Sequence, residues 1–148
     1  GISAGVQSGI AVPLQTVRYR TGPDKQAFCC VHCRLSQDAV ILPTVHACLA
    51  QDYPDDRYDV VVISDHMRPE TNAVLSSLPI KLLQVDFEKS TNTKSLQAAL
   101  GYLDKAAYDI ALVIDADNII APSYLSELND AFSVSASGWY RHIVWPRI

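Results

Sequence analysis

Short apolar runs alternate with amphipathic segments along most of the chain, and this pattern predicts strands separated by helices. Four compact runs rich in Val, Ile, Leu and Cys predict buried strands. Between them, apolar residues recur at the three- and four-residue spacing of one helix face. The predicted strands cover residues 27–33, 58–64, 80–87 and 110–114, and the predicted helices cover residues 38–49, 69–77, 93–107 and 122–132.

Apolar strands that alternate with helices are typical of a parallel sheet covered on both faces. We therefore predict an α/β fold with a Rossmann-like, doubly wound, mainly parallel sheet. In this organisation residues 1–26 are an N-terminal extension, residues 27–132 form the α/β domain, and residues 133–148 form a tail. The tail fits the alternation less well. Its apolar residues predict either a further strand or an exposed apolar end; they are Trp139, Tyr140, Ile143, Val144 and Trp145.

Polar clusters follow three of the predicted strands, at residues 34–38, 64–68 and 115–118. Ligands of doubly wound sheets bind beyond the carboxyl ends of the strands, where the loops converge. We therefore expect the three clusters to share one crevice. In the last cluster, Asp115 and Asp117 are two positions apart, and strand alternation would place them on the same face. Both carboxylates can then converge on a Mg²⁺ or Mn²⁺ ion, which prefers oxygen ligands.

Structural roles for the same residues remain open alternatives. An Asp pair that ends a strand can cap the next helix or be solvated, and a lone Asp such as Asp65 is common in turns.

Three cysteines and a histidine in the first predicted strand suggest a zinc site. Alternation would place Cys29 and Cys33 on one face of the sheet. Cys30 and His32 would lie on the opposite face, which disfavours the tetrahedral convergence that structural zinc needs. Buried core residues are therefore the favoured interpretation.

Composition sets limits on the partners and the compartment. The chain has 148 residues, 49% of them hydrophobic and 19% charged, which is sufficient for one folded domain. Its net charge of -4 provides no general attraction to nucleic acid, so a phosphate-rich ligand needs a local cation.

The cysteine pattern and the N-terminal segment bear on localisation. The four cysteines do not form the framework of a small disulfide-rich domain, which favours a reducing, cytoplasmic compartment. The first 14 residues lack a basic start and are interrupted by polar residues and Pro13, so they predict neither a signal peptide nor a membrane span. Arg18, Arg20 and Lys25 would suit the cytoplasmic face of a membrane if a membrane segment preceded them.

Four motifs occur in a fixed order along the chain. They are Gln-Asp-Tyr-Pro at 51–54, Val-Val-Val-Ile-Ser-Asp at 60–65, Ser-Leu-Gln-Ala-Ala-Leu at 95–100, and Leu-Val-Ile-Asp-Ala-Asp-Asn at 112–118. In this order and spacing the chain resembles, over roughly residues 27–132, the N-terminal half of a family 2 glycosyltransferase. This inverting family has an A-type, Rossmann-like fold. The resemblance implies a hexosyltransferase that moves a sugar from a nucleotide diphosphate to a hydroxyl of a saccharide or lipid-linked acceptor.

The resemblance also assigns roles to particular residues. It implies that Asp65 contacts the nucleotide base, most often uracil. It implies that Asp115 and Asp117 work with the ribose and with a Mg²⁺ or Mn²⁺ ion that bridges the diphosphate. The remaining nucleotide-binding candidates are Arg34, Ser36 and Lys94.

Several positions depart from the family pattern. Cys33, Ser36 and Gln37 stand where the family has Pro, Asn and Glu, and Asn92 stands at the usual Lys. The family's general base, an Asp, is expected beyond Ile148, so we expect this chain alone to bind donor poorly and to transfer no sugar. Two alternatives stay open: a non-catalytic, glycosyltransferase-like binding subunit, and an unrelated doubly wound nucleotide-binding domain. Against the latter, the chain has neither a Gly-x-Gly-x-x-Gly motif nor a phosphate loop of the Gly-Lys-Ser/Thr type.

Overall fold

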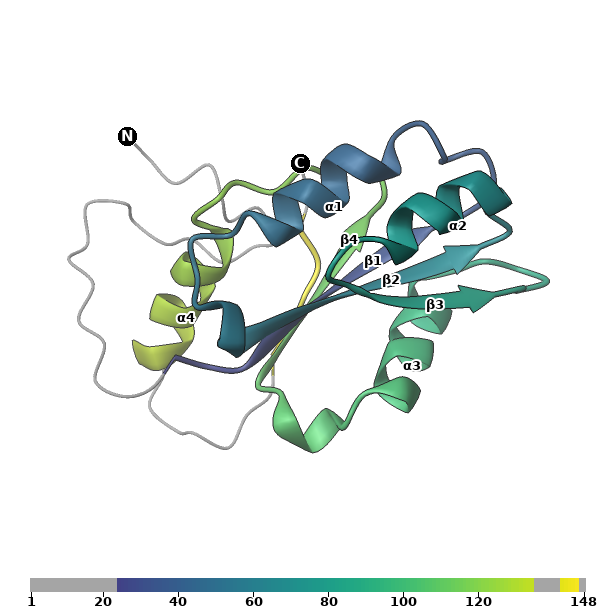
Figure 1. Cartoon of the computed structure of the whole chain (residues 1–148). Coiled ribbons are helices and arrows are strands. Elements are labelled where there is room, and N and C mark those ends of the chain that lie inside the picture. Colours follow the sequence, from purple (N-terminus) through teal and green to yellow (C-terminus); the bar gives the residue numbers. More distant parts are fainter. Residues whose placement is uncertain (1–23, 135–141, 147–148) are drawn as a thin grey trace.

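One parallel sheet with strand order β3-β2-β1-β4-β5 forms the centre of the computed structural model (Figure 1). The structure describes residues 24–134 and 142–146. The strands are β1 (Ala27–Cys33), β2 (Tyr58–Asp65), β3 (Lys81–Val85), β4 (Ile110–Asp115) and β5 (His142–Val144). The helices are α1 (Ile41–Leu49), α2 (Pro69–Ser76), α3 (Asn92–Tyr102) and α4 (Tyr124–Val134), with short 3₁₀ turns at η1 (Asp55–Arg57) and η2 (Lys105–Ala107). The predicted fold class is confirmed.

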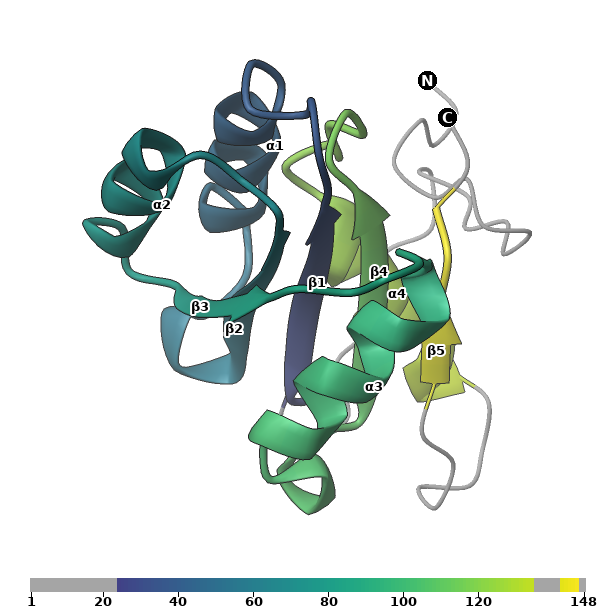
Figure 2. The same cartoon turned by 90° about the vertical axis from the view of Figure 1, so that its right-hand side faces the viewer.

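Helices cover both faces of the sheet (Figures 1 and 2). Apolar residues of α1, α2 and α4 pack on one face, while Leu96, Ala99 and Leu103, from α3 and the position just after it, pack on the other. Side chains of β1 alternate between the two cores: Cys29 and Cys33 lie in the first and Cys30 in the second. The predicted alternation along this strand is therefore confirmed.

Several element boundaries differ from the prediction. The predicted helix 93–107 ends at Tyr102, because the backbone at Leu103 is extended and the Asp104 carboxylate accepts a hydrogen bond from the Ala106 N–H (3.2 Å), which starts η2. The helix predicted from residue 38 begins only at Ile41.

The late start of α1 has a physical cause. The Asp38 carboxylate accepts hydrogen bonds from the Arg68 N–H (3.1 Å) and the Thr71 hydroxyl (2.6 Å) at the start of α2. Asp38 therefore joins the β1–α1 loop to the neighbouring helix. Two further elements differ from the prediction: α4 covers Tyr124–Val134, two residues later than the predicted 122–132, and β3 covers only Lys81–Val85.

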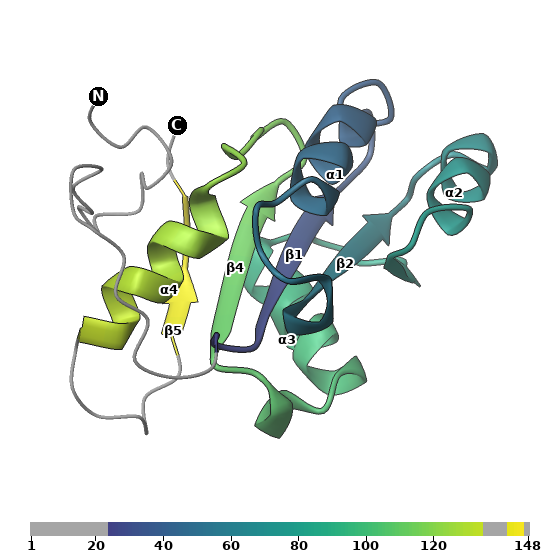
Figure 3. The same ribbon diagram turned by 60° about the vertical axis from the view of Figure 1, so that its left-hand side comes forward.

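Part of the C-terminal tail forms β5, which pairs in parallel with β4 and confirms the strand alternative for that part (Figure 3). Ile143 and Trp145 are exposed there, whereas Trp139 and Tyr140 lie outside the described residues. The N-terminal Arg18 and Arg20 also lie outside them. No helix in the described part of the chain is long and apolar enough to cross a membrane.

The strand order reverses next to β1. The chain runs from β1 outward to β2 and β3, and then returns to the other side of β1 to form β4 (Figure 2). His32 and Asp115, at the carboxyl ends of β1 and β4, are partners in the register of this pair. Ligands of doubly wound sheets bind at such a switch point.

Candidate functional site

A cavity of about 310 Å³ opens at the carboxyl ends of β1 and β4. Its volume lies at the lower end of the range for small-molecule sites. The residues that line it are His32, Arg34, Gln37, Thr91, Asn92, Asp115 and Asp117. The fold thus brings together three of the residues singled out from the sequence, Arg34, Asp115 and Asp117.

Asp115 and Asp117 reach the cavity by a route that the sequence argument did not foresee. Strand β4 ends at Asp115, and Asp117 lies in a turn closed by a hydrogen bond from the Asn118 N–H to the Asp115 carbonyl (3.0 Å). The expectation that strand alternation aligns the pair is wrong. Both side chains are nevertheless exposed and line the same cavity, with the Asn92 amide donating to Asp115 Oδ1 (3.1 Å).

Buried polar side chains hold the loop after β4 at both ends. The Thr44 hydroxyl of α1 donates to the carbonyl of Ala116, between the two aspartates (2.5 Å). At the far end, Gln51 Nε2 donates to the Ala121 carbonyl (2.8 Å) and Gln51 Oε1 accepts from the Leu125 N–H (3.0 Å). The Gln of the 51–54 motif therefore shapes the loop that carries the aspartates, and Thr44 is a supporting residue that no sequence motif indicated.

The N-terminus of α3 lies at the cavity. Thr91 is the N-cap and its hydroxyl accepts a hydrogen bond from the Lys94 N–H (3.1 Å), while Asn92 is the first helical residue. A helix N-terminus favours anions, because its first N–H groups lack helical partners and its dipole is positive there. Thr91 and Asn92 thus place a helix end that suits an anion at the cavity, next to the position where the family has Lys.

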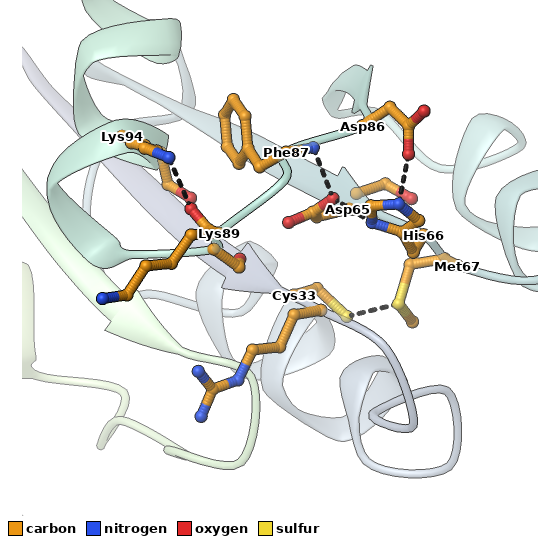
Figure 4. Close-up of polar contacts among 12 residues, drawn as sticks. Cys33, Asp65, His66, Met67, Asp86, Phe87, Lys89 and Lys94 are labelled. Carbon is orange, nitrogen blue, oxygen red and sulfur yellow. Dashed lines mark hydrogen bonds and ion pairs between the residues drawn. The ribbon is translucent and has the colours of Figure 1, made fainter.

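Lys94 does not reach this cavity. Its ammonium group donates to the Lys89 carbonyl (2.7 Å) and lies 5.9 Å from the centroid of the Phe87 ring (Figure 4). Among the described residues that line the cavity, Arg34 is the only Lys or Arg.

The turn after β1 presents Arg34. The Gln37 N–H donates to the Arg34 carbonyl (3.0 Å), and Gln37 Oε1 accepts from the Arg34 N–H (2.9 Å). Ser36 has a positive φ of 75°, is exposed, and is not among the residues that line the cavity. Gln37, which the sequence showed only as a departure from the family's Glu, therefore closes the turn that carries Arg34.

His32 forms a buried wall of the cavity. Its Nδ1 is hydrogen-bonded to the Ser95 hydroxyl of α3, and its Nε2 to the Ser90 hydroxyl (3.2 Å). Burial lowers the pKa of His32 and the Arg34 guanidinium lowers it further, against the opposing effect of nearby carboxylates. The imidazole is therefore neutral at pH 7 and has one N–H and one lone pair for the two hydroxyls.

Asp65 lies beside the cavity but not in its wall. Its side chain is only 1% exposed, and Oδ1 accepts hydrogen bonds from the Phe87 N–H (3.0 Å) and His66 Nδ1 (2.6 Å). Burial raises the pKa of Asp65, but hydrogen bonds from neighbouring groups, the Ser90 hydroxyl foremost, bring it below its ordinary value. Asp65 is therefore a buried carboxylate, linked to the cavity through Ser90 and His32.

The expectation of one crevice for all three polar clusters is wrong for residues 64–68. None of these residues lines the cavity at β1 and β4, and Met67 instead lines a separate hollow between α2 and β3. The reason is that the main chain turns away after β2, where the Arg68 N–H is held by Asp38.

The cavity combines groups suited to a metal-bound diphosphate. Asp115 and Asp117 offer exposed carboxylate oxygens, which are the ligands that Mg²⁺ and Mn²⁺ prefer. Arg34 and the N-terminus of α3 supply positive charge and N–H donors for phosphate oxygens.

The fold resembles that of solved glycosyltransferases. The S. aureus protein TarS 1-349 in complex with UDP matches with a TM-score of 0.56 and 19% identity, covering 70% of this chain and 30% of the TarS 1-349 chain. Its complex with UDP-GlcNAc matches with a TM-score of 0.55 and 18% identity, covering 70% and 30%. The mannosyltransferase PcManGT from Pyrobaculum calidifontis, in complex with GDP-Man and Mn²⁺, matches with a TM-score of 0.59 and 20% identity, covering 85% of this chain and 36% of the PcManGT chain.

The sequence itself matches a family model. The chain spans about a third of the length of these structural neighbours. Comparison with curated protein sequences gave no match. The model described as "Glycosyltransferase like family 2" matches residues 28–138, which is well over half of the chain. The chain therefore belongs to glycosyltransferase family 2.

Proposed function

We propose that this chain is the donor-binding part of a glycosyltransferase, which binds a nucleotide diphosphate sugar, of the uridine type, through Mg²⁺ or Mn²⁺. One observation carries the proposal: Asp115, Asp117, Arg34 and the N-terminus of α3 line a single cavity at the switch point of the sheet. This part of the fold is where a doubly wound sheet binds its ligand. The unrelated-domain alternative is wrong, because the chain belongs to family 2.

Each group in the cavity has a defined task in this proposal. Asp115 and Asp117 would hold the divalent ion, which supplies charge to offset the negative charge that grows on the departing diphosphate. Arg34 would donate to phosphate oxygens, and the first N–H groups of α3 would do the same. The carboxylates are kept in place by the Thr44 and Gln51 hydrogen bonds to the loop.

Asp65 is proposed as the contact for the base. Its Oδ2 atom is buried and accepts no hydrogen bond of good geometry from the described residues, so an acceptor remains for a base N–H. Because the side chain is 1% exposed, this contact requires a shift of the residues that cover it. Ser90, which lies between Asp65 and His32, belongs to the segment that would move.

The transfer step needs a group outside the described cavity. In the proposed reaction, a general base takes the proton of the acceptor hydroxyl, and we propose that this base belongs to a further part of the protein. The acceptor is proposed to be a saccharide or a lipid-linked saccharide, met in the cytoplasm or at the cytoplasmic face of a membrane. This chain alone is expected to release no nucleotide diphosphate when it is given UDP-sugar and acceptor.

Calorimetric titration with UDP and GDP, each with and without Mn²⁺, tests the proposal. The wild type is expected to bind UDP at least about tenfold more tightly with Mn²⁺ than without it, a difference of about 1.4 kcal/mol. Asp117→Ala is expected to abolish this gain. Glu88→Gln is the matched control, because Glu88 is an exposed acid that does not line the cavity. Equal UDP binding with and without Mn²⁺ would contradict the metal site, and no binding of either nucleotide would contradict the donor site.

A second candidate function is a non-catalytic, glycosyltransferase-like binding subunit. The observation that favours it is Asn92, which occupies the position of the usual family Lys and is hydrogen-bonded to Asp115. A form of the protein extended by the part proposed to carry the general base separates the candidates. Release of UDP in the presence of acceptor supports the transferase, whereas metal-dependent binding without release supports the binding subunit.

A further inference from the structure

A second group of potential metal ligands lies at the ends of β2 and β3. Asp65 ends β2, His66 follows it, and Asp86 follows β3. One ligand atom from each of the three residues lies within 4.8 Å of the others (Figure 4). None of them lines the cavity at β1 and β4, so this group is separate from Asp115 and Asp117.

The imidazole of His66 lies between two carboxylates. Its Nδ1 is 2.6 Å from Asp65 Oδ1, and its Nε2 contacts Asp86 Oδ1. A neutral imidazole has only one N–H. If Nδ1 donates to the buried Asp65, the lone pair of Nε2 faces the Asp86 carboxylate, and two electron-pair donors face each other. A metal ion bound between Nε2 and the Asp86 carboxylate would relieve this repulsion.

The charges around His66 suit a divalent cation. In the part of the chain that the structure describes, the ion pairs of Asp65 and Asp86 are both with His66, and neither carboxylate is paired with Lys or Arg. A divalent ion bound there would neutralise the two carboxylates. Asp65 also keeps a buried oxygen, Oδ2, that accepts no hydrogen bond of good geometry there.

His66 and Asp86 are accessible from solvent, and the hydrogen bond to Asp65 fixes the orientation of the His66 ring. The side chain of His66 is 45% exposed and that of Asp86 is 84% exposed, so an ion can reach both from solvent. The buried Asp65 carboxylate is itself fixed by the Phe87 N–H (3.0 Å). A carboxylate bonded to the second nitrogen of a metal-binding histidine fixes its tautomer and ring orientation.

We propose that His66 Nε2 and the Asp86 carboxylate bind a first-row divalent cation such as Zn²⁺, with Asp65 as the residue that orients His66. Imidazole and carboxylate are both ligands of Zn²⁺, and water completes the coordination. This site is independent of the ion proposed for Asp115 and Asp117. It ties the end of β2 to the segment between β3 and α3, whose last residue, Thr91, lines the cavity at β1 and β4.

Side-chain nitrogen NMR of the four histidines during titration with Zn²⁺ at pH 7.5 tests the proposal. The ¹⁵N shifts of an imidazole distinguish a metal-bound, a protonated and a neutral ring. We expect His66 Nε2 to move to a metal-bound shift, with Nδ1 still protonated. His66→Gln identifies the signal. Asp86→Asn should weaken binding at least tenfold and, because Asp86 is exposed, leave the fold intact.

Two further variants make the outcome decisive. Asp65→Asn keeps the size of the side chain and should weaken Zn²⁺ binding by about 10–100-fold, as expected for a residue that orients a ligand. Asp117→Asn should leave the His66 response unchanged, whatever it does to UDP binding. The proposal is overturned if His66 is doubly protonated and unaffected by Zn²⁺, or if Asp86→Asn binds Zn²⁺ as tightly as the wild type.

Discussion

Replacing Thr44 by Val should destabilise the fold and loosen the turn that carries the two aspartates. Thr44 is fully buried in α1, and its hydroxyl donates to the Ala116 carbonyl (2.5 Å). Ala116 is itself fully buried between Asp115 and Asp117. Val has nearly the shape of Thr but no donor, so Thr44→Val leaves the Ala116 carbonyl buried without this partner.

The expected cost follows from this loss. Leaving a buried acceptor unsatisfied costs about 1–3 kcal/mol. For a chain of this length, a loss of about 2 kcal/mol lowers the melting temperature by about 4–8 °C. Thr44→Ser is the matched control, because it keeps the hydroxyl and loses one buried methyl group, worth about 0.8 kcal/mol before any cavity effect.

Urea denaturation and Mn²⁺-dependent UDP binding measure the two consequences. Thr44→Val should lower the free energy of unfolding by more than Thr44→Ser does, and it should weaken the Mn²⁺-dependent part of UDP binding, which Thr44→Ser preserves. Two results would refute this role of Thr44. One is a free energy of unfolding for Thr44→Val within about 0.5 kcal/mol of the wild type. The other is a loss of Mn²⁺-dependent UDP binding in Thr44→Ser but not in Thr44→Val.

Three further outcomes follow from the hydrogen bonds and charges of the site. Gln51→Ala removes bonds to Ala121 and Leu125 and should lower the free energy of unfolding by about 1–3 kcal/mol in urea denaturation; no change would contradict the role of Gln51 in holding the loop. The pKa of His32 is lowered in the folded protein, so the unfolded chain binds a proton at this histidine more readily than the folded chain does. The contribution of neutral His32 to the free energy of unfolding is therefore fully present above its ordinary pKa of about 6.5, and it is lost as the pH falls through the pKa of the folded state. Wild type should therefore lose stability relative to His32→Gln between about pH 7 and pH 5 in thermal melts, and a difference independent of pH would contradict this. Lys94→Ala should leave UDP affinity unchanged within about twofold, whereas Arg34→Ala should weaken it about tenfold; the reverse order would contradict the geometry of the cavity.

Hydrophobic periodicity was sufficient to predict the first four strands and the layers of the fold. The observed bounds of β1 are identical to the predicted ones, because all of its residues are buried and they form one compact, mainly apolar run. Boundaries decided by side-chain hydrogen bonds were not predictable. Asp38 stays outside α1 because it bonds to Arg68 and Thr71, which are about 30 residues away in the chain.

The candidate site was predictable only where its residues adjoin an apolar run in the sequence. Asp115 and Asp117 are recognisable because they end an apolar run, and Arg34 because it follows one. His32 and Thr44 act through contacts with segments distant in sequence, Ser95 and Ala116 respectively, and carry no local pattern. Lys94 was a nucleotide-binding candidate because it is close in sequence to Asn92, but its side chain folds back to the Lys89 carbonyl.

The central claim is that Asp115 and Asp117 hold the metal that binds the donor diphosphate. A crystal structure of this chain grown with UDP and Mn²⁺, with anomalous diffraction to locate the metal, tests it most directly. The account predicts an anomalous peak that contacts both carboxylates and the diphosphate, with Arg34 and the N-terminus of α3 at the phosphate oxygens. UDP bound away from the cavity at β1 and β4, or bound in it with no metal beside Asp115 and Asp117, would contradict the account.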